Sequence, residues 1–116
     1  NHFAQLLENI AGAPVEAHHL CVCQPSDFNH FIDMARPDIV KMDIEGFERF
    51  MLDADPAILG QVPEYIIETH SAEIYCSIQT LLHDLGYEVK FCTHTDTVNH
   101  FGTSFSIDVL HARRIE

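Results

Sequence analysis

The sequence feature that most constrains the fold is a short apolar run followed by a glycine and a helical pattern. Residues 38–44 are mostly apolar, as in a parallel strand that is covered on both faces. Gly46 then lies at a strand-to-helix turn. After it, apolar residues take helical spacing at Phe47, Phe50, Met51 and Ala54. The pattern predicts a β-strand followed by a helix, the repeating unit of α/β sheets.

The rest of the chain repeats this alternation. Residues 65–70 predict a second buried strand, and Ser71 can cap a helix that Gly86 ends. The other expected elements are a helix over 3–10, a strand over 15–23, a helical turn over 27–34, and strands over 87–93 and 105–110. This order predicts an α/β domain with a mainly parallel sheet and an antiparallel strand at its end.

The length and net charge limit which classes of protein and which binding partners we expect. The 116 residues, 47% hydrophobic and 21% charged, suit one soluble domain over residues 1–116. The net charge of −12 repels phosphate backbones and anionic lipid, so we expect neither nucleic acid nor a membrane as partner. Four cysteines without a C-x-x-C pair favour a reduced, cytoplasmic setting. The chain begins at Asn1 rather than Met, which suggests a piece of a longer protein.

The glycines exclude one kind of cofactor site within these 116 residues. The closest two, Gly46 and Gly60, stand 14 residues apart. A dinucleotide fingerprint or a phosphate-binding loop needs glycines within about six residues of one another. We therefore expect no nucleotide-binding turn in this stretch of sequence.

Charged residues end both predicted buried strands. Lys41, Asp43 and Glu45 share one face of an extended strand, and Glu68 and His70 share a face of the next. Ligands of open α/β sheets bind beyond the carboxyl ends of the strands, so Asp43, Glu45 and His70 can act there as a general base or as metal ligands. A structural alternative stays open, in which Lys41 pairs with Glu68 or Asp43 and Glu45 caps its own helix.

Two further groups carry metal-ligating residue types, and ordinary packing or solvation explains them as well. They are His19, Cys21 and Cys23 in the strand over 15–23, and His94, Asp96 and His100 in the loop before the last strand. Three ligands from one strand do not close a tetrahedral shell, and cysteines in strands mostly pack as small hydrophobes. We assign no metal site from the sequence.

Several segments together resemble one enzyme family. Residues 38–48 resemble the K-x-D-x-E-G-x-E signature of the FkbM family of S-adenosylmethionine-dependent methyltransferases, with Lys41, Asp43, Glu45, Gly46 and Glu48 at its fixed positions. Residues 63–70 resemble the family's next strand, which ends in Glu-x-His, and residues 81–87 its L-x-x-L-G-Y helix end. The helix over 3–10 is similar to the one after the family's cofactor-ribose strand.

The resemblance implies a fold and an activity. It implies a class I methyltransferase (Rossmann-like) sheet that lacks the first strands, so that the chain is the C-terminal portion of the domain. The strand and glycine-rich turn that hold S-adenosylmethionine would precede residue 1, so no cofactor-binding residue is assigned. The expected reaction is O-methylation of a hydroxyl on a small molecule or glycan.

The resemblance also implies roles for the strand-end residues. Asp43, Glu45 and His70 would be catalytic: His70 or Asp43 would accept or orient the proton of the substrate hydroxyl, and Glu45 would position substrate or order the turn. Lys41 and Glu68 are assigned to substrate binding.

Two alternatives belong to other classes of protein. Residues 36–43 also resemble the phosphoacceptor strand of a bacterial receiver domain, but the acidic pair and the Lys-Pro dipeptide of that family are missing. The second alternative is a truncated, non-catalytic domain that acts as an interaction module. Loss of central strands would expose a sheet edge, through which a homodimer could form.

Overall fold

The computed structural model describes residues 2–18, 21–44 and 46–115. In chain order its elements are α1 (His2–Asn9), α2 (Pro25–Ala35), β1 (Ile39–Met42), the 3-10 helix η1 (Phe47–Asp53), α3 (Pro56–Leu59), β2 (Glu64–Thr69), α4 (Ala72–Asp84), β3 (Tyr87–Val98) and β4 (Ser104–Arg114). No helix in these ranges is both long and apolar enough to cross a membrane.

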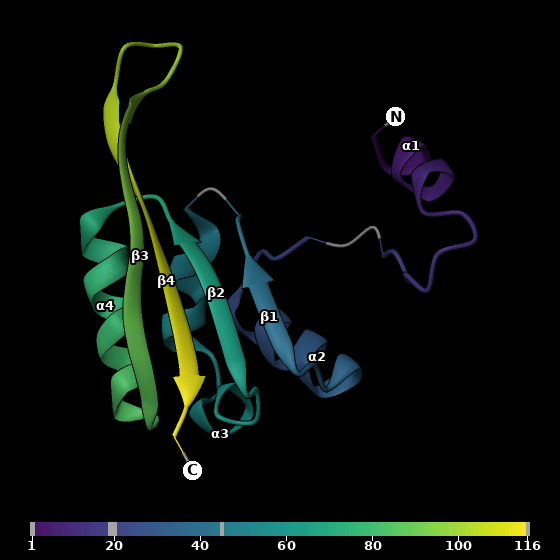
Figure 1. The fold of residues 1–116 in the computed structure, drawn as a ribbon, viewed down its shortest axis with the longest axis horizontal. Coiled ribbons are helices and arrows are strands. Elements are labelled where there is room, and N and C mark those ends of the chain that lie inside the picture. The colour runs from purple at the N-terminus through teal and green to yellow at the C-terminus, as the bar shows by residue number, and fades with distance from the viewer. Residues whose placement is uncertain (1, 19–20, 45, 116) are drawn as a thin grey trace.

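The described strands form one sheet in the order β1-β2-β4-β3 (Figure 1). Strands β1 and β2 run parallel, while β4 lies between β2 and β3 and is antiparallel to both. A register shift between Phe91 and Thr93 marks a bulge in β3. The chain therefore has the expected α/β fold, with one parallel pairing and two antiparallel pairings among these four strands.

One face of the sheet packs against the helices α2, α3, α4 and η1 (Figure 1). On this face, alternate residues of the strands pack against residues of the helices. The core residues are Phe28, Ile32, Met42, Met51, Ala54, Leu59, Val62, Tyr65, Ile67, Ile78, Leu82, Tyr87, Leu110 and Ala112. The hydroxyl groups of Tyr65 and Tyr87 both donate hydrogen bonds to the carbonyl of Leu59. These bonds tie the turn after α3 to β2 and β3, and they satisfy polar atoms that burial would otherwise leave unpaired.

The opposite face of the sheet is only half buried. In β2, Tyr65, Ile67 and Thr69 are buried, whereas Glu64, Ile66 and Glu68 are partly exposed. In β4 the buried face likewise carries Leu110 and Ala112, while the alternate residues stay partly accessible. Glu68 therefore lies on the open face, where a ligand can reach it.

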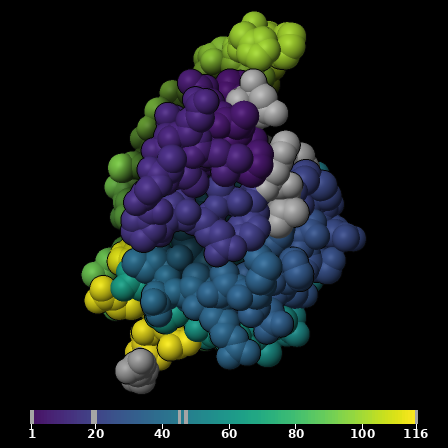
Figure 2. All heavy atoms as spheres, turned by 90° about the vertical axis from the view of Figure 1, so that its right-hand side faces the viewer, coloured from purple at the N-terminus to yellow at the C-terminus, as the bar shows by residue number. Residues whose placement is uncertain are grey.

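The strand predicted over residues 15–23 is absent from the described part of that segment. Residues 15–18 and 21–23 have no regular secondary structure. Helix α1 buries none of its residues and stands apart from the sheet, and Figure 2 shows it and the segment after it on the outside of the molecule. A strand requires a neighbour for its backbone hydrogen bonds, and the sequence pattern alone could not show that none pairs with this segment. His19 lies outside the described residues.

The turn after β1 differs from the expected α-helix. Gly46 has a φ of +98°, a left-handed conformation that glycine adopts without strain, and the helix that follows is a 3-10 helix. The short helix α3 was not predicted; the Asp55 side chain caps it by accepting a hydrogen bond from the Ala57 amide. At α4, Ser71 caps the helix as predicted, because its hydroxyl accepts from the Ile74 amide.

Candidate functional site

The parallel pairing of β1 with β2 brings the charged strand ends together. Met42 pairs with Ile67, so Asp43 and Glu68 lie one residue further along their strands. A carboxylate oxygen of each of these residues and a ring nitrogen of His70 lie within 4.8 Å of one another. The convergence expected from the sequence is thus present for three of the five predicted residues.

A fully buried carboxylate supports His70. Oε1 of Glu48 lies 2.7 Å from Nδ1 of His70, and Oε2 accepts a hydrogen bond from the Gly46 amide at 2.5 Å. Glu48 has no exposed surface, and only 14% of the His70 side chain is exposed. Burial of a charged carboxylate is costly unless both oxygens are satisfied, and here each oxygen has a partner. The bonds join the turn after β1 to the end of β2.

This contact fixes how the imidazole faces the site. A carboxylate accepts hydrogen bonds and has no hydrogen to donate, so Nδ1 of His70 carries the hydrogen of the Glu48 bond. Nε2 then faces Asp43, whose Oδ1 lies 3.6 Å away. That distance is too long for a good hydrogen bond. In the neutral ring, Nε2 therefore presents a lone pair to the site.

Asp43 and Glu68 repel one another. Burial raises the pKa of Glu68 above its usual value, and a hydrogen bond with Asp43 and the charge of Asp43 raise it further. The charges of His70 and Lys41 lower this pKa, with smaller effects than that of Asp43. The pair of carboxylates is therefore not fully compensated by nearby positive charge.

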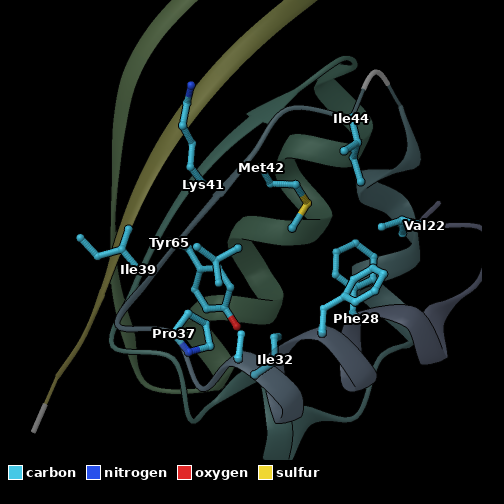
Figure 3. Close-up of a pocket in the computed structure, with 12 residues that line it drawn as sticks. Val22, Phe28, Ile32, Pro37, Ile39, Lys41, Met42, Ile44 and Tyr65 are labelled. Atoms are coloured by element: carbon cyan, nitrogen blue, oxygen red, sulfur yellow. The ribbon is translucent and has the colours of Figure 1, made fainter. Parts of the chain in front are cut away.

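The remaining predicted site residues have different outcomes. Glu45 lies outside the described residues. Lys41 is exposed, and its side chain points away from the core (Figure 3). Among the ion pairs of the described residues, none involves Lys41, so the structural alternative in which it pairs with Asp43 or Glu68 is not observed.

Sequence reasoning missed the part that Glu48 plays. The sequence places it in the first turn of a helix, where it would suit the helix dipole. Instead it is buried and bonded to a residue 22 positions away. The signal in the sequence was that Glu48 is the last acidic residue of the motif over residues 41–48. An exposed position in a helix would not by itself require an acidic residue there.

An apolar groove of about 360 Å³ lies between β1 and α2 (Figure 3). Its lining residues are Val22, Phe28, Phe31, Ile32, Ala35, Pro37, Ile39, Val40, Lys41, Met42, Ile44 and Tyr65. These side chains include no carboxylate that could bind ribose hydroxyls, although they could pack against a ring. The described groove therefore does not by itself fit S-adenosylmethionine, and we assign no cofactor-binding residue to it.

A second polar cluster lies on the β3–β4 hairpin. Nδ1 of His94 bonds to Asp108, and Nε2 lies 3.0 Å from Oδ1 of Asp96. The hydrogen bond with Asp108 is the main cause that raises the pKa of His94 above its usual value. His94 and Asp96 lie in β3, so the prediction that placed them in a loop was wrong. Because both ring nitrogens of His94 have partners, this histidine has no free ligand atom for the metal-binding alternative.

The comparisons with known proteins support the fold. No protein-family profile matches the chain, and no curated protein sequence matches it. Among solved structures, the chain is similar to the precorrin-6y C5,15-methyltransferase from Geobacter metallireducens GS-15, with a TM-score of 0.60 and 14% sequence identity. The match covers 97% of this chain and 59% of that structure. The chain thus shares the fold of part of that structure and spans about three fifths of its length.

The raised pKa of Glu68 leads to a test of the carboxylate pair. A carboxyl whose pKa is higher in the folded than in the unfolded state contributes stability below the unfolded pKa, and this contribution is lost as pH rises through the folded pKa. Glu68→Gln should therefore raise the free energy of unfolding relative to wild type more at pH 7 than at pH 4. Urea denaturation of both proteins at the two pH values measures this difference. A difference that is equal at both pH values would contradict the interpretation.

Proposed function

We propose that the strand-end site is the substrate side of an S-adenosylmethionine-dependent methyltransferase that methylates a hydroxyl of a small molecule or glycan. The fold likeness to a methyltransferase and the FkbM-like motif over residues 41–48 support the proposal. The observation that carries it is the hydrogen bond from His70 to the buried Glu48, which leaves Nε2 facing the carboxyl ends of β1 and β2. That place is where open α/β sheets bind their ligands.

His70 acts as the proton acceptor in this proposal. When a hydroxyl oxygen gains a methyl group it must lose its proton, and Nε2 of His70 takes it. Asp43, 3.6 Å from Nε2, orients the hydroxyl and stabilises the imidazolium that forms. A positioned proton acceptor of this kind is worth about 10²- to 10⁴-fold in rate.

The other assigned residues hold the substrate. Glu68 lies beside Asp43 on the open face and would accept hydrogen bonds from further hydroxyl groups of a sugar or similar acceptor. Lys41 is exposed on β1 and would bind a polar substituent. Glu45 would position substrate or order the turn. When bound, S-adenosylmethionine would supply the methyl group, and by the resemblance the turn that holds it would precede residue 1.

Titration calorimetry with S-adenosylhomocysteine tests this proposal. The ligand is added to the 116-residue chain and to the same chain extended upstream along its natural reading frame. Because the described groove has no carboxylate for the ribose hydroxyls, the shorter chain should show no binding at millimolar ligand, whereas the extended chain should bind with a stoichiometry of one. Absence of binding to both forms would count against a methyltransferase.

A second candidate function is supported by the free edge of β1. This strand is the outer member of the sheet, Ile39 on it is 54% exposed, and the apolar groove lies beside it. An exposed apolar edge strand has unpaired backbone N–H and C=O groups that can bond to the backbone of another chain. The surface could therefore serve as an interaction module, with a second copy of the chain as the simplest partner.

Sedimentation velocity distinguishes this second candidate. The chain should form a dimer in solution, and Ile39→Lys should shift it towards the monomer because a charged side chain disfavours edge pairing. Ile115→Lys, at an apolar residue after β4 that is 65% exposed, is the matched control and should leave the dimer intact. A monodisperse wild-type monomer would rule out the dimer.

A further inference from the structure

We propose that Asp43, Glu68 and His70 bind a divalent cation that accepts both carboxylate and imidazole ligands, such as Mn²⁺. The sequence by itself assigns no metal site, and the family resemblance places Glu68 in substrate binding. The inference goes beyond methyl transfer, because the cation site follows from these three side chains whether or not the chain belongs to a methyltransferase.

The geometry of the three side chains suits one ion. Their ligand atoms lie within 4.8 Å of one another. Ligands that bind one ion with bonds of about 2.1 Å can be at most about 4.2 Å apart, so small side-chain rotations close the site. Asp43 directly follows β1, and Glu68 lies near the end of β2. Because these neighbouring strands are parallel, both residues lie at the same end of the sheet. Three protein ligands leave further coordination positions open for water or substrate.

The histidine has the environment of a metal ligand. A histidine that binds a metal through one nitrogen usually donates the hydrogen of the other to a carboxylate or carbonyl, which fixes the ring and makes it a better ligand. Glu48 takes this hydrogen bond from Nδ1 at 2.7 Å while fully buried. Nε2, the free nitrogen, is the atom that faces Asp43. Glu48 is therefore a positioning residue for the proposed site.

Charge also favours a cation here. Carboxylate oxygens of Asp43 and Glu68 lie within 4.8 Å of each other, and none of the ion pairs of the described residues joins either one to Lys41. A divalent cation between the two carboxylates would turn their repulsion into attraction. The Asp43 side chain is 48% exposed, which leaves a path for the ion to enter.

The donor set selects among cations. Carboxylate oxygens suit Mg²⁺, Ca²⁺ and Mn²⁺, and an imidazole nitrogen suits transition metals. Mn²⁺ accepts both, whereas Mg²⁺ keeps its waters and prefers all-oxygen sites. A cation here would bind a substrate hydroxyl at an open position and lower the pKa of that hydroxyl, which eases loss of its proton. With Nε2 of His70 bound to the ion, this proton would pass to water, so the cation site is an alternative to the role of His70 as proton acceptor.

Electron paramagnetic resonance of free Mn²⁺ tests the site without cofactor or substrate. The 116-residue chain should take up one equivalent of Mn²⁺, with at least tenfold weaker affinity for Mg²⁺ in competition. Asp43→Asn and Glu68→Gln should each weaken Mn²⁺ binding by about tenfold or more, because each removes a charged ligand. Asp38→Asn makes the same charge change at an exposed residue before β1 and should bind as wild type does.

The outcomes separate this inference from the proposed function. Circular dichroism of each variant without metal checks the fold, and Asp43→Asn should stay folded because it removes a repulsive charge. Equal Mn²⁺ affinity in wild type and Asp43→Asn, or no uptake by the folded wild-type chain at millimolar Mn²⁺, would overturn the site. Either result leaves the test with S-adenosylhomocysteine unaffected, and failure of that test leaves Mn²⁺ binding unaffected.

Discussion

The hydrogen bond between the buried carboxylate of Glu48 and the ring of His70 is the interaction on which the rest of the site depends. A charged group with no exposed surface costs several kcal/mol unless its oxygens are satisfied, and Glu48 has two partners. One partner is the Gly46 amide in the turn after β1, and the other is the histidine after β2. The contact therefore joins two strand ends and directs Nε2 of His70 towards Asp43. Both a proton acceptor and a metal ligand need this orientation.

The one-sided packing of the sheet explains where the site can act. The helices and the core lie on one face, and the alternate face keeps residues such as Glu68 accessible. The free edge of β1 and the apolar groove beside it give the chain a surface that can pair with further strands or with a second copy. The candidate strand-end site thus lies next to an edge with which no described strand pairs, and the two candidate functions rest on these neighbouring features.

Local signals in the sequence were sufficient for much of the fold. The apolar runs over 38–44 and 65–70 predicted the parallel strands β1 and β2. The expected burial of both strands on both faces was wrong, because alternate residues of β2 are partly exposed and Ile39 on β1 is 54% exposed. Ser71 and Gly86 predicted where α4 begins and ends, because helix caps are determined by residues close in sequence. The convergence of Asp43, Glu68 and His70 followed from the period of a strand and from parallel pairing.

Other features were not predicted, and two of them depend on contacts with residues distant in sequence. Residues 15–23 alternate as a strand does, but a strand exists only where another backbone pairs with it. The buried position of Glu48 depends on His70, 22 residues later, and no local pattern marks an acid as buried. The 3-10 form of η1 was not predicted either, since apolar spacing alone favours an α-helix.

The most direct test of the Glu48–His70 arrangement is the tautomer of His70, measured by long-range ¹H–¹⁵N correlation on the chain labelled with ¹⁵N-histidine. The chain has nine histidines, and loss of one signal set in His70→Gln identifies the resonances of interest. The structure predicts that the neutral ring carries its hydrogen on Nδ1 and leaves Nε2 unprotonated. A neutral ring with its hydrogen on Nε2 would contradict the proposed roles of His70 as proton acceptor and metal ligand.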